Sequence, residues 1–396
     1  MKVYIINANY GHGGPGGIAK DLYDVLERQG HTVRFGYARE EKPININCFR
    51  YGLKIETLAH AFLTRLFDCG GFLSYFSTRR LIKDIKKFKP DVISIHNPLG
   101  YTLSVPALLS FIDSASIPTF YTLHDCWLFT GHCIFALSCN RLSVGCGKCP
   151  NKKEFPASYF FDRSKHNLRV KIKKLSNIKN LHLVSCSEWI YRLSKKSYLA
   201  PYPNIVINNG IDLNVFKQTY SDFKEKNDLS NKVIILGVAS VWSKRKGESY
   251  FRKLSEVAEK NWQIVLVGRG LSSDTKNKAN IMCLEEIKKA EELANIYNSA
   301  DVFVNPTIGD NYPTVNLEAI ACGLPVVTFD TGGSGEMIGN CGRVVKKGDF
   351  DGLFKAIQNV LSEPIEKNKF INQANGFDKK QKYLEYVKLF EKSVEN

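Results

Sequence analysis

Two acidic residues, Asp310 and Glu318, stand on either side of a point where a helix should begin. Pro313 suits the first turn of a helix, and Gly323 suits the position at which one ends. At about 1.5 Å per residue, Glu318 lies roughly 8 Å along this helix. Two carboxylates so placed could hold two parts of one extended ligand, with the helix N-terminus directed at its phosphates. The alternative, a capping acid and a surface acid, is disfavoured because apolar residues flank Glu318.

A glycine-rich turn near the start of the chain also suits a phosphate. It lies between an apolar run at residues 3–7, expected to be a strand, and a helix expected over residues 17–29. Gly14, Gly16 and Gly17 would let the backbone approach a ligand closely, and the helix N-terminus behind them favours an anion. The spacing is not Gly-x-Gly-x-x-Gly, so a tight turn without a ligand stays open and a dinucleotide-dependent dehydrogenase is disfavoured.

Cysteines gather in one segment, where five of the 11 lie between residues 126 and 149. Four of them, Cys133, Cys139, Cys146 and Cys149, are spaced C-x5-C-x6-C-x2-C. Only the last pair has the short spacing typical of zinc ligands. The pattern predicts a structural zinc site, and free thiols or labile disulfides are the alternative that it leaves open.

The net charge of +16 is spread unevenly. Residues 1–200 contain 29 Lys and Arg against 14 Asp and Glu, whereas residues 201–396 contain 26 against 25. The excess in the first half fits either solvated helix faces or a surface for anionic lipid. Nucleic acid is not expected as a partner, because no recognition motif accompanies the charge.

The chain shows no targeting or spanning segment. Its N-terminal apolar run is too short for a signal peptide, and no apolar run is long enough for a transmembrane helix. Cysteines in such a chain favour thiols in a reducing compartment. We therefore expect a cytoplasmic protein, held peripherally at the inner face of the cell membrane by its basic half.

Short apolar runs alternate with longer amphipathic stretches along the whole chain. Strands are expected at residues 3–7, 32–35, 92–96, 119–123, 183–185, 205–207, 233–238, 264–267, 302–304 and 326–329. Such runs suit strands buried on both faces, and the stretches between them imply right-handed βαβ crossovers. The pattern predicts two doubly wound α/β domains with a junction near residues 208–212. Residues 379–395 have the apolar spacing of a closing amphipathic helix.

With these motifs, the chain resembles the GT4 family of retaining glycosyltransferases, which have the GT-B fold, over nearly its whole length. Asp310 and Glu318 fit the family's two-acid motif with its gap of seven residues. Further similar segments are 13–17, Thr122-Leu123-His124-Asp125, Asn209-Gly210-Ile211-Asp212 with Phe216, Lys246-Gly247, and Gly332-Gly333-Ser334 with Glu336. Residues 124–133 look most similar to a branch from bacterial exopolysaccharide clusters, of the colanic-acid type.

The resemblance implies a division of roles between two Rossmann-like domains with a cleft between them. Residues 1–210 would form the acceptor-side domain, residues 211–378 the nucleotide-sugar donor domain, and residues 379–396 a helix that crosses back to the first domain. The cysteine segment would then shape the acceptor side and take no part in donor chemistry.

The resemblance also assigns the site residues. Asp310 would hold hydroxyls of the transferred sugar, and His124 would lie near the sugar ring as the second catalytic residue. His96, at the end of another strand, is as easily structural as functional. Glu318 would accept hydrogen bonds from the donor ribose. Lys246 and Arg245, with the amides of Gly14, Gly16 and Gly17, would stabilise the diphosphate leaving group without a metal cofactor.

Two departures from the family pattern bear on these roles. The first acid of the family motif is usually Glu, and here Asp310 stands in its place with a shorter arm. The family usually has Arg in a Gly-Arg-Leu segment shortly before the Lys-Gly pair, and residues 237–241 lack it. Arg245 would replace that Arg, so phosphate contact is better supported for Lys246 than for Arg245.

The sequence therefore predicts a hexosyltransferase that moves a sugar, with retention, from a UDP- or GDP-sugar to a saccharide acceptor. We expect a lipid-linked acceptor and a role in bacterial surface polysaccharide synthesis. The alternatives are a nucleotide-sugar epimerase or hydrolase of the same fold, and a catalytically dead, zinc-stabilised binding protein.

Overall fold

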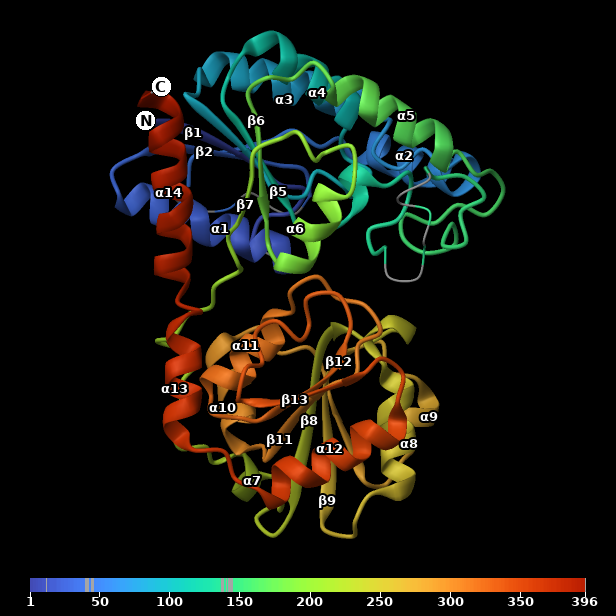
Figure 1. Ribbon diagram of the computed structural model, residues 1–396, viewed down its shortest axis with the longest axis vertical. Coiled ribbons are helices and arrows are strands. Elements are labelled where there is room, and N and C mark those ends of the chain that lie inside the picture. The colour runs from blue at the N-terminus through green and yellow to red at the C-terminus, as the bar shows by residue number, and fades with distance from the viewer. Residues whose placement is uncertain are drawn as a thin grey trace. The chain divides into compact units, whose positions relative to one another are not determined.

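The computed structural model describes residues 1–395 apart from residues 12, 40–42, 44–45, 137–138, 140 and 142–144. The chain divides into two compact units. Unit 1 comprises Met1–Asn208 and Tyr383–Asn396, and unit 2 comprises Asn209–Lys382. Each unit is a parallel sheet with helices on both faces (Figure 1). The predicted fold class, two doubly wound α/β domains, is confirmed.

Unit 1 is built on a seven-stranded sheet with the order β3-β2-β1-β4-β5-β6-β7. The strands are β1 (Lys2–Ile6), β2 (Thr32–Tyr37), β3 (Cys48–Arg50), β4 (Val92–Ile95), β5 (Thr119–Leu123), β6 (Leu181–Ser185) and β7 (Asn204–Val206). Its helices are α1 (Gly13–Arg28), α2 (Lys54–Phe67), α3 (Tyr75–Phe88), α4 (Val105–Ala115), η1 (Trp127–Phe129), α5 (Ser164–Leu175) and α6 (Glu188–Lys195).

Unit 2 has a six-stranded sheet with the order β10-β9-β8-β11-β12-β13. Its strands are β8 (Val233–Val241), β9 (Trp262–Arg269), β10 (Ile281–Leu284), β11 (Val302–Asn305), β12 (Val326–Asp330) and β13 (Gly342–Lys346). Its helices are α7 (Phe223–Lys226), η3 (Lys244–Lys246), α8 (Glu248–Val257), α9 (Ser273–Lys276), α10 (Ala290–Ser299), α11 (Thr314–Ala321), α12 (Phe350–Ser362) and α13 (Lys367–Asn375); α14 (Lys379–Glu395) begins in this unit and ends in unit 1.

Every strand expected from an apolar run is present, and three strands were not expected. These are β3, β10 and β13, all of which lie at sheet edges. An edge strand has a neighbouring strand on one side only, and most residues of these three strands are partly or fully exposed. β3 and β13 therefore lack the continuous apolar run by which the central strands were found. β10 does have such a run, Ile281–Leu284, which the sequence analysis missed. The prediction that the first helix begins at residue 17 was wrong, because α1 begins at Gly13 and takes in the glycine-rich turn.

Helix α14 completes the core of unit 1. Tyr383, Tyr386, Val387 and Phe390 are buried in one cluster with residues of α1 and the central strands. The ring centroid of Phe390 lies 4.7 Å from the ring centroid of Phe120 on β5. The predicted amphipathic helix is thus present.

One isolated parallel β-bridge in unit 2, between Ile211 and Asp378, ties the start of that unit to the start of α14. Ile211 donates its backbone N–H to the Phe377 carbonyl at 2.8 Å and accepts from the Lys379 N–H at 3.0 Å. Gly210 fits against this backbone, since a Cβ there would lie 2.4 Å from the Lys379 Cα. Both segments of the chain that pass between the units are therefore anchored to each other within unit 2.

We predict that Phe390→Ala destabilises unit 1 by about 3–5 kcal/mol, because the substitution leaves a cavity under the sheet. Val394→Ala in the same helix is the matched control, since Val394 is 45% exposed and surface changes usually stay within about 0.5 kcal/mol. Urea unfolding followed by circular dichroism measures both. Equal unfolding midpoints for the two variants would contradict the assignment of α14 to this core.

Candidate active site

Asp310 forms an ion pair with Lys246 in unit 2. The Lys246 Nζ donates to Asp310 Oδ2 at 2.6 Å, and Arg245 Nη1 lies 3.5 Å from the same oxygen. Burial raises the pKa of Asp310, but the charges of Lys246 and Arg245 outweigh that effect and hold the pKa below its usual value. The carboxylate is thus ionised at neutral pH, and the three side chains together carry one net positive charge.

Backbone packing holds this cluster in place. Gly332, at a φ of +59°, lies so close to Asp310 that a Cβ would stand 1.8 Å from the Asp310 carbonyl oxygen. That carbonyl also accepts from the Gly333 N–H at 3.1 Å. At Gly247, which has a φ of +80°, a Cβ would stand 2.1 Å from the Pro306 carbonyl oxygen. Only glycine fits at either position, which gives the two predicted glycine motifs a structural reason.

Glu318 lies on α11, in the segment that begins after Asp310. Burial raises the pKa of Glu318 to about 7, although hydrogen bonds from Tyr297 and Thr314 oppose the rise. The Tyr297 hydroxyl donates to Glu318 Oε2 at 3.0 Å. Tyr297 comes from α10 and belongs to no motif, so sequence reasoning missed it. A carboxyl with such a pKa is poised to ionise when a ligand donates hydrogen bonds to it.

Asn316 is a second residue that the sequence did not indicate. Its side chain is fully buried on α11, where it accepts from Asn305 Nδ2 at 2.8 Å and donates to the Ser334 carbonyl at 3.0 Å. It therefore ties the end of β11 to the late glycine-rich turn and fixes α11 between them. A polar residue inside an apolar helix was the only signal in the sequence.

His124 and His96 meet in unit 1 at the carboxyl ends of β5 and β4. Their Nε2 and Nδ1 atoms lie 3.0 Å apart, and the two rings stack with centroids 5.3 Å apart. Burial lowers the pKa of His124 to about 3. Burial and then the neighbouring His124 lower the pKa of His96 well below its usual value. Both rings are therefore neutral at pH 7, and His124 could contact a ligand as a hydrogen-bonding group without charge.

The glycine-rich first turn of α1 lies at the same edge of the unit 1 sheet, after β1. A small cavity of about 180 Å³ there is lined by Gly16, Arg39, Asn97 and neighbouring residues. Gly14 and Gly17 have open space where a Cβ would stand, so a ligand could approach their backbone. The predicted site residues thus form two groups, with Asp310, Lys246, Arg245 and Glu318 in unit 2, and His124 with the three glycines in unit 1.

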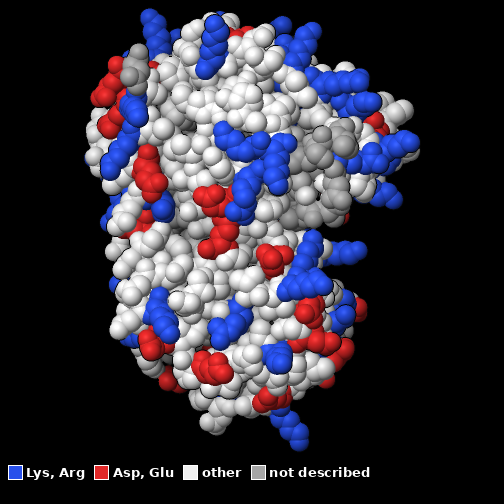
Figure 2. Space-filling view, in the orientation of Figure 1, with Lys and Arg blue, Asp and Glu red and all other residues white. Residues whose placement is uncertain are grey.

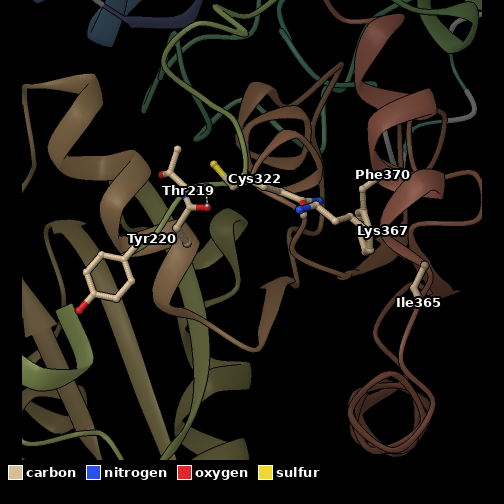
Figure 3. A pocket seen from close by; sticks show the side chains of 9 residues that line it. Thr219, Tyr220, Cys322, Ile365, Lys367 and Phe370 are labelled. Atoms are coloured by element: carbon tan, nitrogen blue, oxygen red, sulfur yellow. Dashed lines mark hydrogen bonds between the residues drawn. The ribbon is translucent and has the colours of Figure 1, made fainter. Parts of the chain in front are cut away.

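A larger cavity in unit 2 contains none of these residues. It measures about 520 Å³ and lies beside Cys322 and Gly323, at the end of α11 remote from Asp310. Figure 3 shows Lys367 and Phe370 on one side of it and Thr219 on the other. No acidic side chain lines it, so the predicted chemistry does not belong there.

The four clustered cysteines are all free thiols in the structure. Burial raises the pKa of Cys133 to about 11 and that of Cys149 to about 12, so both are protonated at neutral pH. Within the described part of the chain, no three His, Cys, Asp or Glu side chains are arranged to hold a metal ion. As they are placed, the cysteines do not fit a zinc ion, and zinc binding stays a prediction that requires the sulfur atoms to move.

The chain matches two families of known proteins. Residues 12–215 match the family described as "Glycosyltransferase Family 4", and residues 232–363 match "Glycosyl transferases group 1". The chain belongs to glycosyltransferase family 4. The resemblance expected from the motifs is thereby confirmed, and the enzyme is a glycosyltransferase.

Two relatives of the enzyme are informative. The putative colanic acid biosynthesis glycosyl transferase WcaC of Escherichia coli is 24% identical over 358 residues, 86% of each chain. A UDP-Gal:alpha-D-GlcNAc-diphosphoundecaprenol alpha-1,3-galactosyltransferase, also of Escherichia coli, is 28% identical over 205 residues, which cover 46% of this chain and 53% of the relative.

Solved structures confirm the GT-B fold. Anabaena Alr3699/HepE, solved with UDP-glucose, superposes with a TM-score of 0.68 and is 17% identical, with 99% of this chain and 100% of that chain covered. This likeness concerns the fold. The roles of the individual site residues stay predictions.

We predict that nucleotide-sugar binding weakens as the pH falls through the pKa of Glu318. In the role that the resemblance implies for Glu318, ribose hydroxyls would donate to the ionised carboxylate, so binding would favour deprotonation. Affinity should therefore drop about tenfold between pH 8 and pH 6. Calorimetry at the two pH values measures this, and Glu318→Gln should bind weakly and with no such dependence. An equal pH dependence in the Gln variant would show that another group is responsible.

Zinc is tested by metal analysis of enzyme purified without added zinc. One equivalent in the wild type, lost in Cys146→Ser together with a lower melting temperature, would support the site, because a structural zinc stabilises the segment that binds it. Metal-free enzyme with an unchanged melting temperature in chelator would rule it out.

Proposed function

We propose that the enzyme transfers a sugar, with retention of configuration, from a UDP- or GDP-sugar to a saccharide acceptor. The observation that carries this proposal is the cluster of Asp310, Lys246 and Arg245. In a nucleotide-sugar the diphosphate is bonded directly to the sugar, so cations for the phosphates and an acid for the sugar hydroxyls must be neighbours. The ion pair of 2.6 Å between Lys246 and Asp310 meets that requirement.

The cluster also supports transfer without a metal cofactor. When the sugar leaves, negative charge grows on the diphosphate, and Lys246 and Arg245 can neutralise it in a partly buried site. As the diphosphate binds Lys246, Asp310 is released from that cation and becomes free to accept hydrogen bonds from the sugar. Retention is part of the proposal because the motifs resemble those of the retaining family.

Glu318 serves the other end of the donor in this proposal. It is already hydrogen-bonded by Tyr297, which orients the carboxyl, and its raised pKa means that it gains most from hydroxyl donors. His124 is proposed as the second catalytic residue, and the backbone of Gly14, Gly16 and Gly17 as further donor contacts.

The acceptor is proposed to be a lipid-linked saccharide in the synthesis of a bacterial surface polysaccharide. The names of two relatives support this, since one concerns colanic acid biosynthesis and the other a sugar carried on diphosphoundecaprenol. Within the described residues, no helix combines the length and apolar character needed to span a bilayer. We propose that the enzyme reaches such an acceptor by peripheral binding at the cytoplasmic face of the membrane.

A screen of nucleotide-sugars by thermal shift tests the proposal. Donor binding raises the melting temperature by mass action, so UDP- or GDP-sugars should stand out from other nucleotides. Release of nucleotide should then require a saccharide acceptor. No shift with any nucleotide-sugar would contradict the proposal, and full turnover without an acceptor would favour an epimerase or hydrolase instead.

Substitution of the two acids should have different effects on donor affinity and on kcat. Glu318→Gln should weaken donor binding about tenfold to hundredfold, because a charged hydrogen-bond acceptor for the ribose is lost. Asp310→Asn should leave donor binding unchanged or tighter, since Lys246 is freed, but should lower kcat about tenfold to hundredfold. Steady-state kinetics and calorimetry on both variants measure this. Wild-type affinity and turnover in both would contradict the assignment of the site.

A further inference from the structure

Helix α2 of unit 1 has its apolar side in solvent. Ile55, Leu58 and Phe62 lie along one face at helical spacing and are 84%, 62% and 61% exposed. The opposite face is polar and buried, because His60 bonds to Ser74 and the Cys69 carbonyl. This is the reverse of an ordinary surface helix, which turns its apolar stripe to the core. The outer face of α2 is therefore available to contact apolar surroundings outside this unit.

A second segment extends this apolar face. The rings of Phe67 and Phe161 stack with centroids 5.4 Å apart. The Tyr159 and Phe161 N–H groups donate to carbonyls of α2, Arg65 and Leu66, at 2.8 and 3.1 Å. Residues 159–161 thus run along the end of α2 and present further exposed aromatic rings.

The start of α3 adds the third part of the same surface. Glu56 of α2 accepts the Phe76 N–H at 2.9 Å and also the N–H of Ser77, so the exposed rings of Tyr75 and Phe76 stand beside the first turn of α2. We call the whole set the α2 surface; its members are Ile55, Leu58, Phe62, Phe67, Tyr75, Phe76, Tyr159, Phe160 and Phe161. An exposed cluster of so many large apolar side chains marks an interaction site.

Basic residues are interleaved with this surface. Lys54 and Arg65 are exposed on α2, and Lys152 donates to the Phe160 carbonyl at 3.3 Å. Two nearby acids already accept hydrogen bonds from the protein: Glu56 caps the start of α3, and the exposed Asp162 accepts from Ser164 and the Cys149 N–H. Figure 2 shows Lys and Arg gathered over the part of unit 1 that carries α5 in Figure 1.

We propose that the α2 surface inserts into the leaflet of an anionic bilayer. An apolar helix face with aromatic rings and a basic border is the composition of interfacial helices, which bury the apolar side at the acyl boundary and hold anionic headgroups with the cations. A second copy of the chain is a poorer occupant, because paired copies would bring these like charges together. Attachment therefore depends on the entry of apolar side chains into the hydrocarbon as well as on charge attraction.

The proposal rests on the lipid-linked acceptor of the proposed function. Insertion at the α2 surface would bring such an acceptor from the membrane to unit 1. Phe155, also exposed, lies 5.6 Å by ring centroids from Tyr101 and lines the small polar cavity with Arg39 and Gly16. The segment that begins at Phe155 leads directly into the α2 surface. A saccharide carried by a lipid in the leaflet would therefore emerge next to a polar cavity in unit 1.

Insertion is tested with tryptophan placed on the surface. Phe62→Trp should be quenched by vesicles of phosphatidylglycerol and phosphatidylethanolamine whose acyl chains carry bromine. Ile371→Trp is the matched control, because Ile371 is an exposed apolar helix residue of unit 2, and it should not be quenched. Binding of Phe62→Trp without quenching would overturn insertion.

Serine variants measure the contribution of the surface to binding. Leu58→Ser and Phe62→Ser should each lower partitioning into the same vesicles about tenfold or more, whereas Ile371→Ser should not. The proposal would be overturned if the first two variants partitioned into the vesicles as the wild type does. It would also be overturned if the substitutions dissociated a dimer of the enzyme and left vesicle binding unchanged. Melting temperatures close to the wild type show that the variants are folded.

The vesicles contain no acceptor and no donor, so failure of the proposed function would leave these results unchanged. Donor binding by the serine variants, measured by calorimetry, should equal that of the wild type. Loss of vesicle binding with donor binding intact would therefore show that the α2 surface binds the membrane independently of the donor site.

Discussion

The ion pair between Asp310 and Lys246 is the contact on which the site in unit 2 depends. The two residues come from segments that follow neighbouring strands, β11 and β8, so the parallel order of the sheet brings them together. Ligand sites in open α/β sheets lie at this carboxyl edge. The pair requires the backbone to pack without side chains at Gly332 and Gly247. The glycines, helix α11 and the strand order thus act together to fix the position of the Asp310–Lys246 pair.

Unit 1 follows the same architectural rule with different chemistry. Its glycine-rich turn, His96 and His124 follow β1, β4 and β5, at the carboxyl edge of the sheet. Burial keeps the histidines neutral, whereas the site of unit 2 concentrates charge. Part of the basic excess of the first half of the chain borders the α2 surface, at Lys54, Arg65 and Lys152. The proposed membrane attachment therefore uses other residues than the proposed donor site.

Much of this could be predicted from the sequence, because buried strands and glycine motifs have local patterns. The central strands appear as continuous apolar runs, and Asp310 and Glu318 stand in a spaced motif. Edge strands such as β13 bury too little to leave such a run. Tyr297 reaches Glu318 only through tertiary packing. The inverted exposure of α2 was also hidden, because an amphipathic pattern does not say which face turns inward.

The central claim is that the donor binds at the Asp310–Lys246 cluster. Hydrogen exchange followed by mass spectrometry, with and without a nucleotide-sugar, tests it most directly. UDP-glucose or GDP-mannose should slow exchange in peptides that contain residues 244–247 and 308–318. Slower exchange confined to the cavity beside Cys322 and Lys367, or no change in unit 2, would contradict the account.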